Sequence, residues 1–250
     1  MNEQELCKKR LIDLSKQAEH KNIVLFSDFL NLNEQSIYHA NKNDMFSKGI
    51  LFGGYDSAER QMIAFIPDAL SYEWEYPIFC LRIRPLALKF AENLTHRDIL
   101  GSIMNLGIDR SKLGDILCKE NNYYVFCEEI ICKIIHEQLS RIRHTTVIVE
   151  DVPLPLDMEI TPDFEEVNEL VASNRIDGII AKAYHLSRSE AANYIASEKV
   201  FLNGKCITNC NTSLHNSDIV SVRGKGRFRF YTNDVLSKKG KLRILIKKYI

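Results

Sequence analysis

Cationic side chains recur along the C-terminal third of this 250-residue chain, among short helical patterns and turns, at positions that suit contact with phosphate groups. Arg and Lys neutralise phosphate charge, and a helix N-terminus adds backbone N–H donors that face an anion. Gly residues between the last cations let a phosphate backbone approach without side-chain obstruction. The candidate RNA-contacting residues are Arg175, Asp177, Lys182, Ser187, Arg188, Lys199, Asn203, Lys205, Arg223, Lys225 and Arg227.

The charge of the chain is divided sharply, although its net value is zero. From residue 174 to the end, 15 Lys and Arg stand against five Asp and Glu, a net charge of +10. The remainder carries 18 against 28, a net charge of −10. This asymmetry predicts that the basic end meets a polyanion through phosphate neutralisation and counterion release. The alternative is a basic surface that serves only solubility.

Two short helices and two turns are expected to position these cations. Residues 175–184 and 187–197 have helical patterns, and Ser187 with Glu190 forms the S-x-x-E capping box of the second helix. Asn203-Gly204 predicts a tight hairpin, because both residues accept positive φ. Residues 217–222 alternate as a strand before the Gly-spaced basic loop at 223–227.

The N-terminal part has mixed patterns and no recognisable phosphate loop. Helices are expected at residues 2–21, 23–30 and 34–41, and a strand follows at 62–66. Gly53-Gly54 lacks the Lys and the further Gly residues of nucleotide-binding loops, so it is interpreted as a turn before that strand.

The middle part predicts the order β-α-β-β-α-β between residues 76 and 149, the ferredoxin-like arrangement that RNA-recognition folds share. The aromatic RNA-binding signature of those folds is absent, so Tyr123, Tyr124 and Phe126 are expected to pack rather than stack on bases.

Thr95 and Asp98 are expected to form a capping box at the start of the first helix of this part. A proline-containing connector is expected at 151–162, and an acidic segment, read as a short helix, at 164–173.

No constellation of catalytic or metal-binding residues stands out. The seven cysteines lack paired C-x-x-C spacing, which argues against a disulfide framework and a zinc site, and Cys206 with Cys210 lacks two further ligands. His96-Arg97-Asp98 resembles a kinase triplet, but the other kinase motifs are missing. We therefore expect no catalytic residue, metal or cofactor. The lack of a long apolar run and of a signal-peptide pattern predicts a cytoplasmic protein.

The basic unit resembles the RNA-binding domain first described in small-subunit ribosomal protein S-four. Pseudouridine synthases and tyrosyl-tRNA synthetases also carry that domain. Glu198 and Ser217 stand where many members have Gly, and these departures affect turn geometry more than the basic surface. The matching positions are Arg175, Asp177, Ser187-Arg188-Ser189, Ala192, Val200, Asn203-Gly204-Lys205, Asp218-Ile219 and Val222-Arg223.

Nearly the full length resembles the bacterial YlmH family. The family implies binding to the large ribosomal subunit and tRNA, with a role in rescuing stalled translation products. The residues that carry the resemblance are Gly53-Gly54-Tyr55, Glu59-Arg60, His96-Arg97-Asp98, Leu100-Gly101, Gly114-Asp115-Ile116 and the segment Arg223 to Phe228.

The patterns and the resemblance together predict an α+β chain. The expected parts are an N-terminal α/β domain (1–75), a ferredoxin-like, RNA-recognition-like middle domain (76–160) and an S-four-type αL RNA-binding domain (174–250). The expected function is non-catalytic binding of rRNA and tRNA on the large ribosomal subunit, by a monomer without membrane association. Two alternatives stay open: an RNA-modifying enzyme that docks through the C-terminal domain, and a cell-division-associated scaffold.

Overall fold

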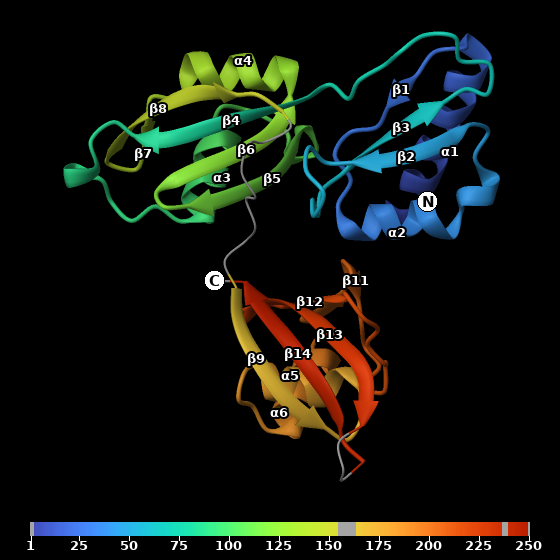
Figure 1. Ribbon diagram of the computed structural model, residues 1–250, viewed down its shortest axis with the longest axis vertical. Helices are drawn as coiled ribbons and strands as arrows, with labels where there is room; N and C mark the ends of the chain where they lie inside the picture. Colours follow the sequence, from blue (N-terminus) through green and yellow to red (C-terminus); the bar gives the residue numbers. More distant parts are fainter. Residues whose placement is uncertain (1–2, 155–163, 237–239, 250) are drawn as a thin grey trace. The chain divides into compact units, whose positions relative to one another are not determined.

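The computed structural model describes residues 3–154, 164–236 and 240–249, with only the backbone described at 233–236. The chain forms two compact units, Met1–Thr161 and Pro162–Ile250, each with its own sheets and hydrophobic core (Figure 1). The second unit includes a strand that the predicted domain start at residue 174 leaves out. The predicted boundary at residue 75, inside the first unit, stays a prediction. Within the described ranges, no helix has the length and apolar character that crossing a membrane requires.

The first unit begins with helix α1, which packs on a small antiparallel sheet of order β1-β3-β2. Its buried residues recur every three or four positions, so one face of the helix meets the sheet as its pattern predicts. The predicted helix at 23–30 is wrong, because a short apolar run fits a buried strand as well as a helix. The elements are α1 (Glu3–Lys21), β1 (Leu25–Phe26), α2 (Leu32–Ala40), β2 (Lys48–Phe52) and β3 (Met62–Ile66), with a 3-10 helix at Lys42–Asp44.

The larger sheet of the first unit has the order β5-β6-β4-β8-β7 and is antiparallel throughout. The predicted ferredoxin-like order is confirmed, with the short strand β7 added before the last strand. Helices α3 and α4 pack on one face and share its core. The elements are β4 (Ile78–Pro85), α3 (His96–Met104), β5 (Leu113–Lys119), β6 (Asn122–Glu128), α4 (Glu129–Gln138), β7 (Arg141–Ile142) and β8 (Thr145–Val152), with 3-10 helices at Leu88–Phe90 and Arg110–Lys112.

The opposite face of this sheet is covered at one end. Tyr124 and Phe126 are 5% and 0% exposed and form a cluster with Phe29 and Met62 from the N-terminal part. Their predicted packing role, and that of the buried Tyr123, is confirmed. Because these rings are covered within the unit, this end of the sheet is not an open platform for bases.

A network of two cations and one carboxylate lies on neighbouring strands of the same sheet. Arg84 donates to both carboxylate oxygens of Glu150, at 2.8 and 3.1 Å, and Arg82 donates to Oε2 at 2.9 Å. Hydrogen bonds from Arg84 and then Arg82 lower the pKa of the Glu150 carboxyl from 4.5 to about 2.

We expect Glu150→Gln to change how stability depends on pH. A carboxylate whose pKa is lowered by folding stabilises the protein above its ordinary pKa, and that contribution is lost as pH falls from 4.5 toward 2. The free energies of unfolding of the wild type and the variant should therefore differ most at neutral pH and converge in this window. Urea titrations at stepped pH test this, and a difference that stays constant with pH would contradict it.

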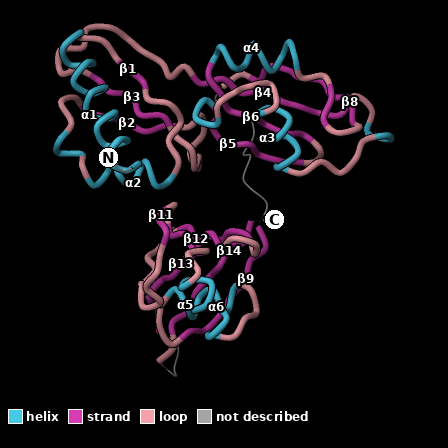
Figure 2. The backbone as a smooth tube through the Cα atoms, turned by 180° about the vertical axis from the view of Figure 1, so that it is seen from behind, coloured by secondary structure: helices cyan, strands magenta, loops and turns pink. Residues whose placement is uncertain are grey.

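The second unit is a six-stranded antiparallel sheet of order β11-β10-β12-β13-β14-β9. Figures 1 and 2, drawn from opposite sides, show α5 and α6 on one face of it. The acidic segment predicted as a short helix is strand β9, which pairs with β14 along its whole length, so that prediction is wrong. The predicted connector at 151–162 overlaps the end of β8 and otherwise lies outside the described residues. The elements are β9 (Phe164–Val171), α5 (Ile176–Ala183), α6 (Arg188–Ala196), β10 (Val200–Leu202), β11 (Lys205–Cys206), β12 (Ile219–Val222), β13 (Gly226–Leu236) and β14 (Leu242–Tyr249).

Candidate nucleic-acid interface

The starts of helices α5 and α6 place two arginines close together. Arg175 immediately precedes α5, and Arg188 is the first residue of α6. The predicted capping box is present: the Ser187 hydroxyl accepts from the Glu190 N–H at 3.2 Å, and the Glu190 carboxylate accepts from the Ser187 N–H at 2.7 Å. The capping box fixes the start of α6 and therefore the position from which the Arg188 side chain projects.

One buried carboxylate, that of Asp177, holds both guanidinium groups. Arg175 donates to it twice, at 3.0 and 3.2 Å, and Arg188 Nη2 lies 3.4 Å from each of its oxygens. The Asp177 side chain is 8% exposed, whereas those of Arg175 and Arg188 are 39% and 63% exposed. Asp177 therefore orients two cations toward solvent, and its own position behind them is suited to positioning rather than to contact with RNA.

The charge state of Asp177 follows from these contacts. Burial acts to raise the pKa of its carboxyl, but hydrogen bonds from Arg175 and the Gly178 N–H, together with the charges of both arginines, bring that pKa below its ordinary value. The carboxylate is ionised at neutral pH and attracts both guanidinium groups. Part of each cation's charge is thus offset, but the N–H donors that face solvent remain available for a phosphate.

The predicted Gly-spaced loop at 223–227 is the tight connection between β12 and β13. The Lys225 N–H donates to the Val222 carbonyl at 3.0 Å, and Val222 pairs with Gly226 across the hairpin. Gly224 and Gly226 have φ values of 81° and 119°, which side-chain-bearing residues rarely adopt. Both glycines are needed for the turn, and the three cations between and beside them are exposed.

The backbone of this basic loop lies near the end of α5. A Cβ on Gly226 would be 3.7 Å from the Tyr184 hydroxyl at the end of α5. Burial raises the pKa of Tyr184, and the positive charge of Arg227 acts in the opposite direction. Hydrogen bonds from Ser187 lower the pKa of the Glu190 carboxyl, with a smaller contribution from the charge of Lys225.

The hairpin that joins β10 to β11 forms at the predicted Asn-Gly pair. Asn203 and Gly204 have φ values of 47° and 80°. The Asn203 amide donates to Asp218 at 2.8 Å and accepts from the Ile219 N–H at 2.9 Å. Both ends of the Asn203 side chain therefore fix the turn from inside the protein, while Lys205 on the edge strand is exposed.

Two further predicted residues lie next to aromatic rings, one on helix α6 and one on strand β10. The Lys199 ammonium is 5.8 Å from the centre of the Tyr194 ring, and the Arg223 guanidinium is 4.9 Å from that of Phe201. The Arg223 N–H donates to the Lys199 carbonyl at 2.9 Å, so the two backbones are neighbours. Lys199 and Arg223 form a second cationic group where β10 begins and β12 ends, and Arg223 belongs to the basic loop as well.

The Lys182 ammonium pairs with Glu169 of β9 at 3.0 Å, and Lys182 lines the same pocket as Gly178 and Arg188. The acidic strand also pairs Glu165 and Glu166 with Lys248 and Lys247, at 2.8 and 2.9 Å. The compact unit at 162–250 thus holds 15 Lys and Arg against nine Asp and Glu, a net charge of +6 rather than the +10 counted from residue 174. The cations of β14 were missed by sequence reasoning, although basic residues recur along this strand.

The YlmH-like motifs of the first unit hold two sheets together. The Asp115 carboxylate on β5 accepts from the Tyr55 hydroxyl at 2.7 Å and from the N–H groups of Glu59 and Arg60 at 2.7 and 3.1 Å. The Tyr55 ring stacks on the ring of Phe126, with centroids 5.0 Å apart. Asp115 is therefore committed to anchoring the loop before β3 and is not poised for catalysis.

The Arg60 side chain closes the same joint. Its guanidinium donates to the carbonyls of Leu113, Phe29 and Arg110, at 2.8, 2.7 and 3.2 Å. Burial lowers the pKa of Arg60, while nearby carboxylates act to raise it. Because its donors satisfy backbone acceptors inside the unit, this cation is structural rather than RNA-binding.

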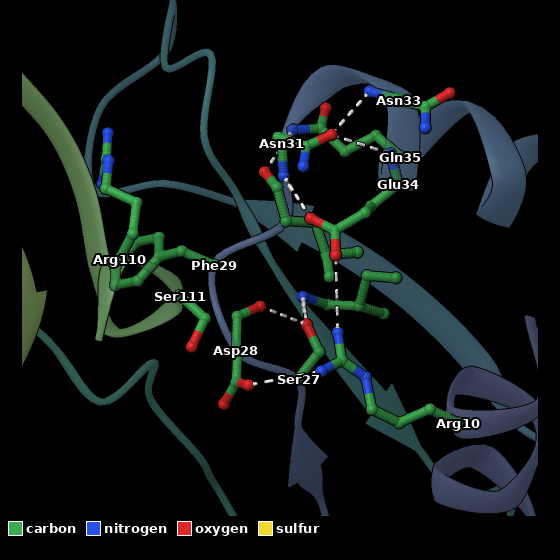
Figure 3. A network of polar contacts seen from close by, with 12 residues as sticks. Arg10, Ser27, Asp28, Phe29, Asn31, Asn33, Glu34, Gln35, Arg110 and Ser111 are labelled. Atoms are coloured by element: carbon green, nitrogen blue, oxygen red, sulfur yellow. Dashed lines mark hydrogen bonds and ion pairs between the residues drawn. The ribbon is translucent and has the colours of Figure 1, made fainter. Parts of the chain in front are cut away.

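Figure 3 shows the neighbouring polar network, in which Arg10 of α1 lies between two carboxylates. Its nitrogens are 3.5 Å from Asp28 and 3.7 Å from Glu34. Asn31 caps α2 through a capping box with Glu34, and the Phe29 N–H donates to the Ser111 carbonyl at 2.9 Å. These charges are paired locally and fasten the loop before α2.

The residues considered for catalysis or metal binding have other partners or surroundings. Asp98 forms the predicted capping box with Thr95, which is confirmed, and so serves the start of α3. Cys206 is exposed and Cys210 is partly buried. In the part of the chain that the structure describes, no three His, Cys, Asp or Glu side chains gather in a way that could hold a metal ion.

An α+β fold with a ferredoxin-like domain, joined to a unit with anchored, exposed arginines, fits the class of RNA-binding proteins. Residues 73–155 match the family model described as "Putative RNA-binding domain in YlmH", which covers the ferredoxin-like sheet. The match identifies a YlmH-type RNA-binding domain within the chain and agrees with the YlmH resemblance that the sequence motifs predict.

Two known proteins are similar to the chain. The chain is 28% identical over 225 residues to "Ribosome-associated protein quality control protein P2" of Bacillus subtilis (strain 168), covering 89% of this chain and 86% of the relative. The solved structure of "Cell division protein ylmH from Streptococcus pneumoniae" aligns with a TM-score of 0.51 at 23% identity, over 63% of this chain and 96% of that one. The second comparison shows a shared fold.

Proposed function

We propose that this protein is a non-catalytic RNA-binding factor that associates with the large ribosomal subunit, contacts rRNA and tRNA, and acts in quality control of stalled translation. The observation that carries the proposal is the pair of exposed arginines held by one buried carboxylate, Asp177, beside the basic loop at 223–227. Such preorganised guanidinium groups recognise phosphates through paired N–H donors. The ribosome is part of this proposal because the similar B. subtilis protein is named a ribosome-associated quality control protein.

The proposed contacts divide between the two cationic groups. Arg175 and Arg188, with Ser187 and the basic loop, would grip the backbone of folded RNA, while Lys199 and Lys205 would meet a second strand or loop. Asp177 and Asn203 would position these groups from within. The site of action would be the cytoplasm, where ribosomes work, and one protein chain would suffice for binding.

The acidic side chains that an RNA-modifying enzyme could use have structural partners in this fold. Asp177 holds two arginines, Asp115 accepts three hydrogen bonds, and Asp98 caps a helix. A carboxylate in such contacts is already engaged with donors of the protein, which supports binding rather than chemistry as its role.

Cosedimentation of the purified chain with separated ribosomal subunits tests the proposal. We expect the protein to pellet with large subunits and not with small subunits, and to be released when the rRNA is digested with RNase. Release by high salt should accompany this, because phosphate contacts are salt-sensitive. A protein that pellets with neither subunit, or that keeps its partners after RNase, would overturn the proposal and favour a scaffold.

A further inference from the structure

The face of the second unit's sheet that lies opposite α5 and α6 has an unusual composition. Phe228, Phe230 and Ile246 point into the core, being 0% exposed, so their neighbours along β13 and β14 point outward. We call this surface the outer sheet face, and its main residues are Phe201, Arg223, Arg227, Tyr231, Lys247 and Tyr249.

Cations and aromatic rings alternate across the outer sheet face. The guanidinium carbons of Arg223 and Arg227 lie 4.9 and 5.7 Å from the ring centres of Phe201 and Tyr249. The Lys247 ammonium lies 5.9 Å from the ring centre of Tyr231 and 5.8 Å from that of Phe164 on β9. These rings are partly exposed on the face opposite α5 and α6 (Figure 1), and the rings of Phe164 and Tyr249 also pack edge to face with centroids 4.9 Å apart.

The charge of this face is one-sided. Among the described side chains that point outward from these strands, Glu166 is the one carboxylate, and it pairs with Lys247 at 2.9 Å. The outward-pointing cations are Arg223, Arg227, Arg229, Arg243 and Lys247. A flat surface with rings and a positive excess fits a partner that has both aromatic faces and negative charges.

We propose that the outer sheet face binds single-stranded RNA, with unpaired bases stacking on the rings and the cations meeting the phosphates between them. The inference rests on the proposed RNA-binding function and extends its surface: Arg223 and Arg227 belong both to the basic loop and to the outer sheet face, whereas Tyr231, Lys247 and Tyr249 belong to the outer sheet face alone. Base stacking on an aromatic ring is stronger than an exposed cation–π contact, so a base can displace a cation, which then reaches the adjoining phosphate.

The geometry selects unpaired RNA over a double helix. Outward-pointing residues on one strand recur about 7 Å apart, which suits splayed bases of an extended strand. A base-paired A-form helix conceals the flat faces of its bases in the stack, so the rings would have nothing to contact. Binding through stacking is tolerant of sequence, because every base has a π-face.

The test is the affinity of the full chain for a labelled oligouridine of about 12 nucleotides, a length within the range of known single-strand sites. We expect Tyr231→Leu combined with Tyr249→Leu to weaken binding at least about 20-fold, because two stacking contacts are lost. Tyr231→Phe with Tyr249→Phe keeps both rings and should bind like the wild type. Phe46→Leu is the matched control, since Phe46 of the first unit is 54% exposed with the Lys16 ammonium 5.7 Å from its ring centre.

Salt dependence separates stacking from charge. The Tyr-to-Leu variant should lose affinity equally at low and high salt, whereas Lys247→Gln should reduce the slope of log affinity against log salt by about 1. Thermal unfolding shows whether each variant is folded. If the Leu variant is not folded, binding by the folded Phe variant still tests whether the rings suffice without their hydroxyl groups.

The outcomes distinguish this inference from the proposed function. If the wild type pellets with large subunits but does not bind oligouridine, or if folded Tyr-to-Leu protein binds it like the wild type, the outer sheet face is not an RNA site. If the wild type binds neither subunits nor oligouridine, the proposed function fails with it. Failure of the Phe variants to bind while remaining folded would also overturn the stacking assignment.

Discussion

Replacing Asp115 with Ala should lower the free energy of unfolding of the first unit by about 3 kcal/mol. The carboxylate accepts three hydrogen bonds, from the Tyr55 hydroxyl and the N–H groups of Glu59 and Arg60. A hydrogen bond to a charged group contributes about 1.5–3 kcal/mol, and water entering the vacated space recovers part of the total. Urea unfolding followed by circular dichroism measures the change.

Asp109→Ala is the matched control for this prediction. Asp109 is exposed and accepts one backbone hydrogen bond, from the Ser111 N–H at 2.8 Å, in the segment just before β5. Its removal should cost far less stability than the removal of Asp115. Tyr55→Phe should fall between the two, because it deletes one hydrogen bond and keeps the stack on Phe126. Equal losses for Asp115→Ala and Asp109→Ala would show that the joint does not stabilise the unit.

Local chemistry explains which elements the sequence predicts well. The capping boxes at Thr95 and Ser187 and the Asn203-Gly204 turn each depend on residues within three positions, and all three are present as expected. Asp177 is identified from the resemblance of its segment to the S-four-type domain. Its burial behind Arg175 and Arg188 required the fold, because that depends on how the two helices pack.

Long-range pairing explains what the sequence does not predict. Strand β9 alternates poorly in polarity, since Glu165 and Glu166 occupy positions whose partners, Lys248 and Lys247, come from β14 near the end of the chain. Its identity as a strand therefore depends on cross-strand ion pairs that no local window contains.

The glycine pair of the first unit illustrates the same limit. A turn at Gly53-Gly54 is predicted from the sequence, but the reason for Gly54 lies elsewhere. Gly54 has a φ of 100°, and a Cβ there would meet the Phe126 ring at 2.5 Å. The position thus requires Gly for both its backbone conformation and its packing against a distant strand.

The ferredoxin-like domain and the C-terminal unit contribute unequally to the proposed RNA contact. Tyr124 and Phe126, which lie where RNA-recognition folds bind bases, are buried by residues of the N-terminal part. Arg82 and Arg84 on the same sheet share the carboxylate of Glu150. By contrast, Arg175 and Arg188 share a carboxylate that is itself buried, and the Arg188 side chain is 63% exposed, against 40% and 37% for Arg82 and Arg84. The C-terminal unit is therefore the better candidate for the main contact.

Replacing Arg175 and Arg188 together with Ala should weaken binding to large ribosomal subunits about 100-fold. Each guanidinium can make charge-assisted hydrogen bonds to a phosphate, which contribute about 1.5–3 kcal/mol each. The slope of log affinity against log salt should fall by about 2, because two phosphate contacts are lost. Quantitative cosedimentation at several salt concentrations measures both effects, and undiminished binding by the folded variant would contradict the assignment.

Two further variants separate geometry from charge at this site. Arg175→Lys with Arg188→Lys preserves both charges but removes the planar fork, so it should lose less affinity than the Ala pair and keep the salt slope. Asp177→Asn makes the protein more positive by one charge. If net charge alone determined the affinity for the large subunit, this variant would bind more tightly. We expect it instead to weaken binding about 10-fold, because Arg175 and Arg188 lose the carboxylate that orients them. Tighter binding by the Asn variant would show that the anchored geometry is not what RNA recognises.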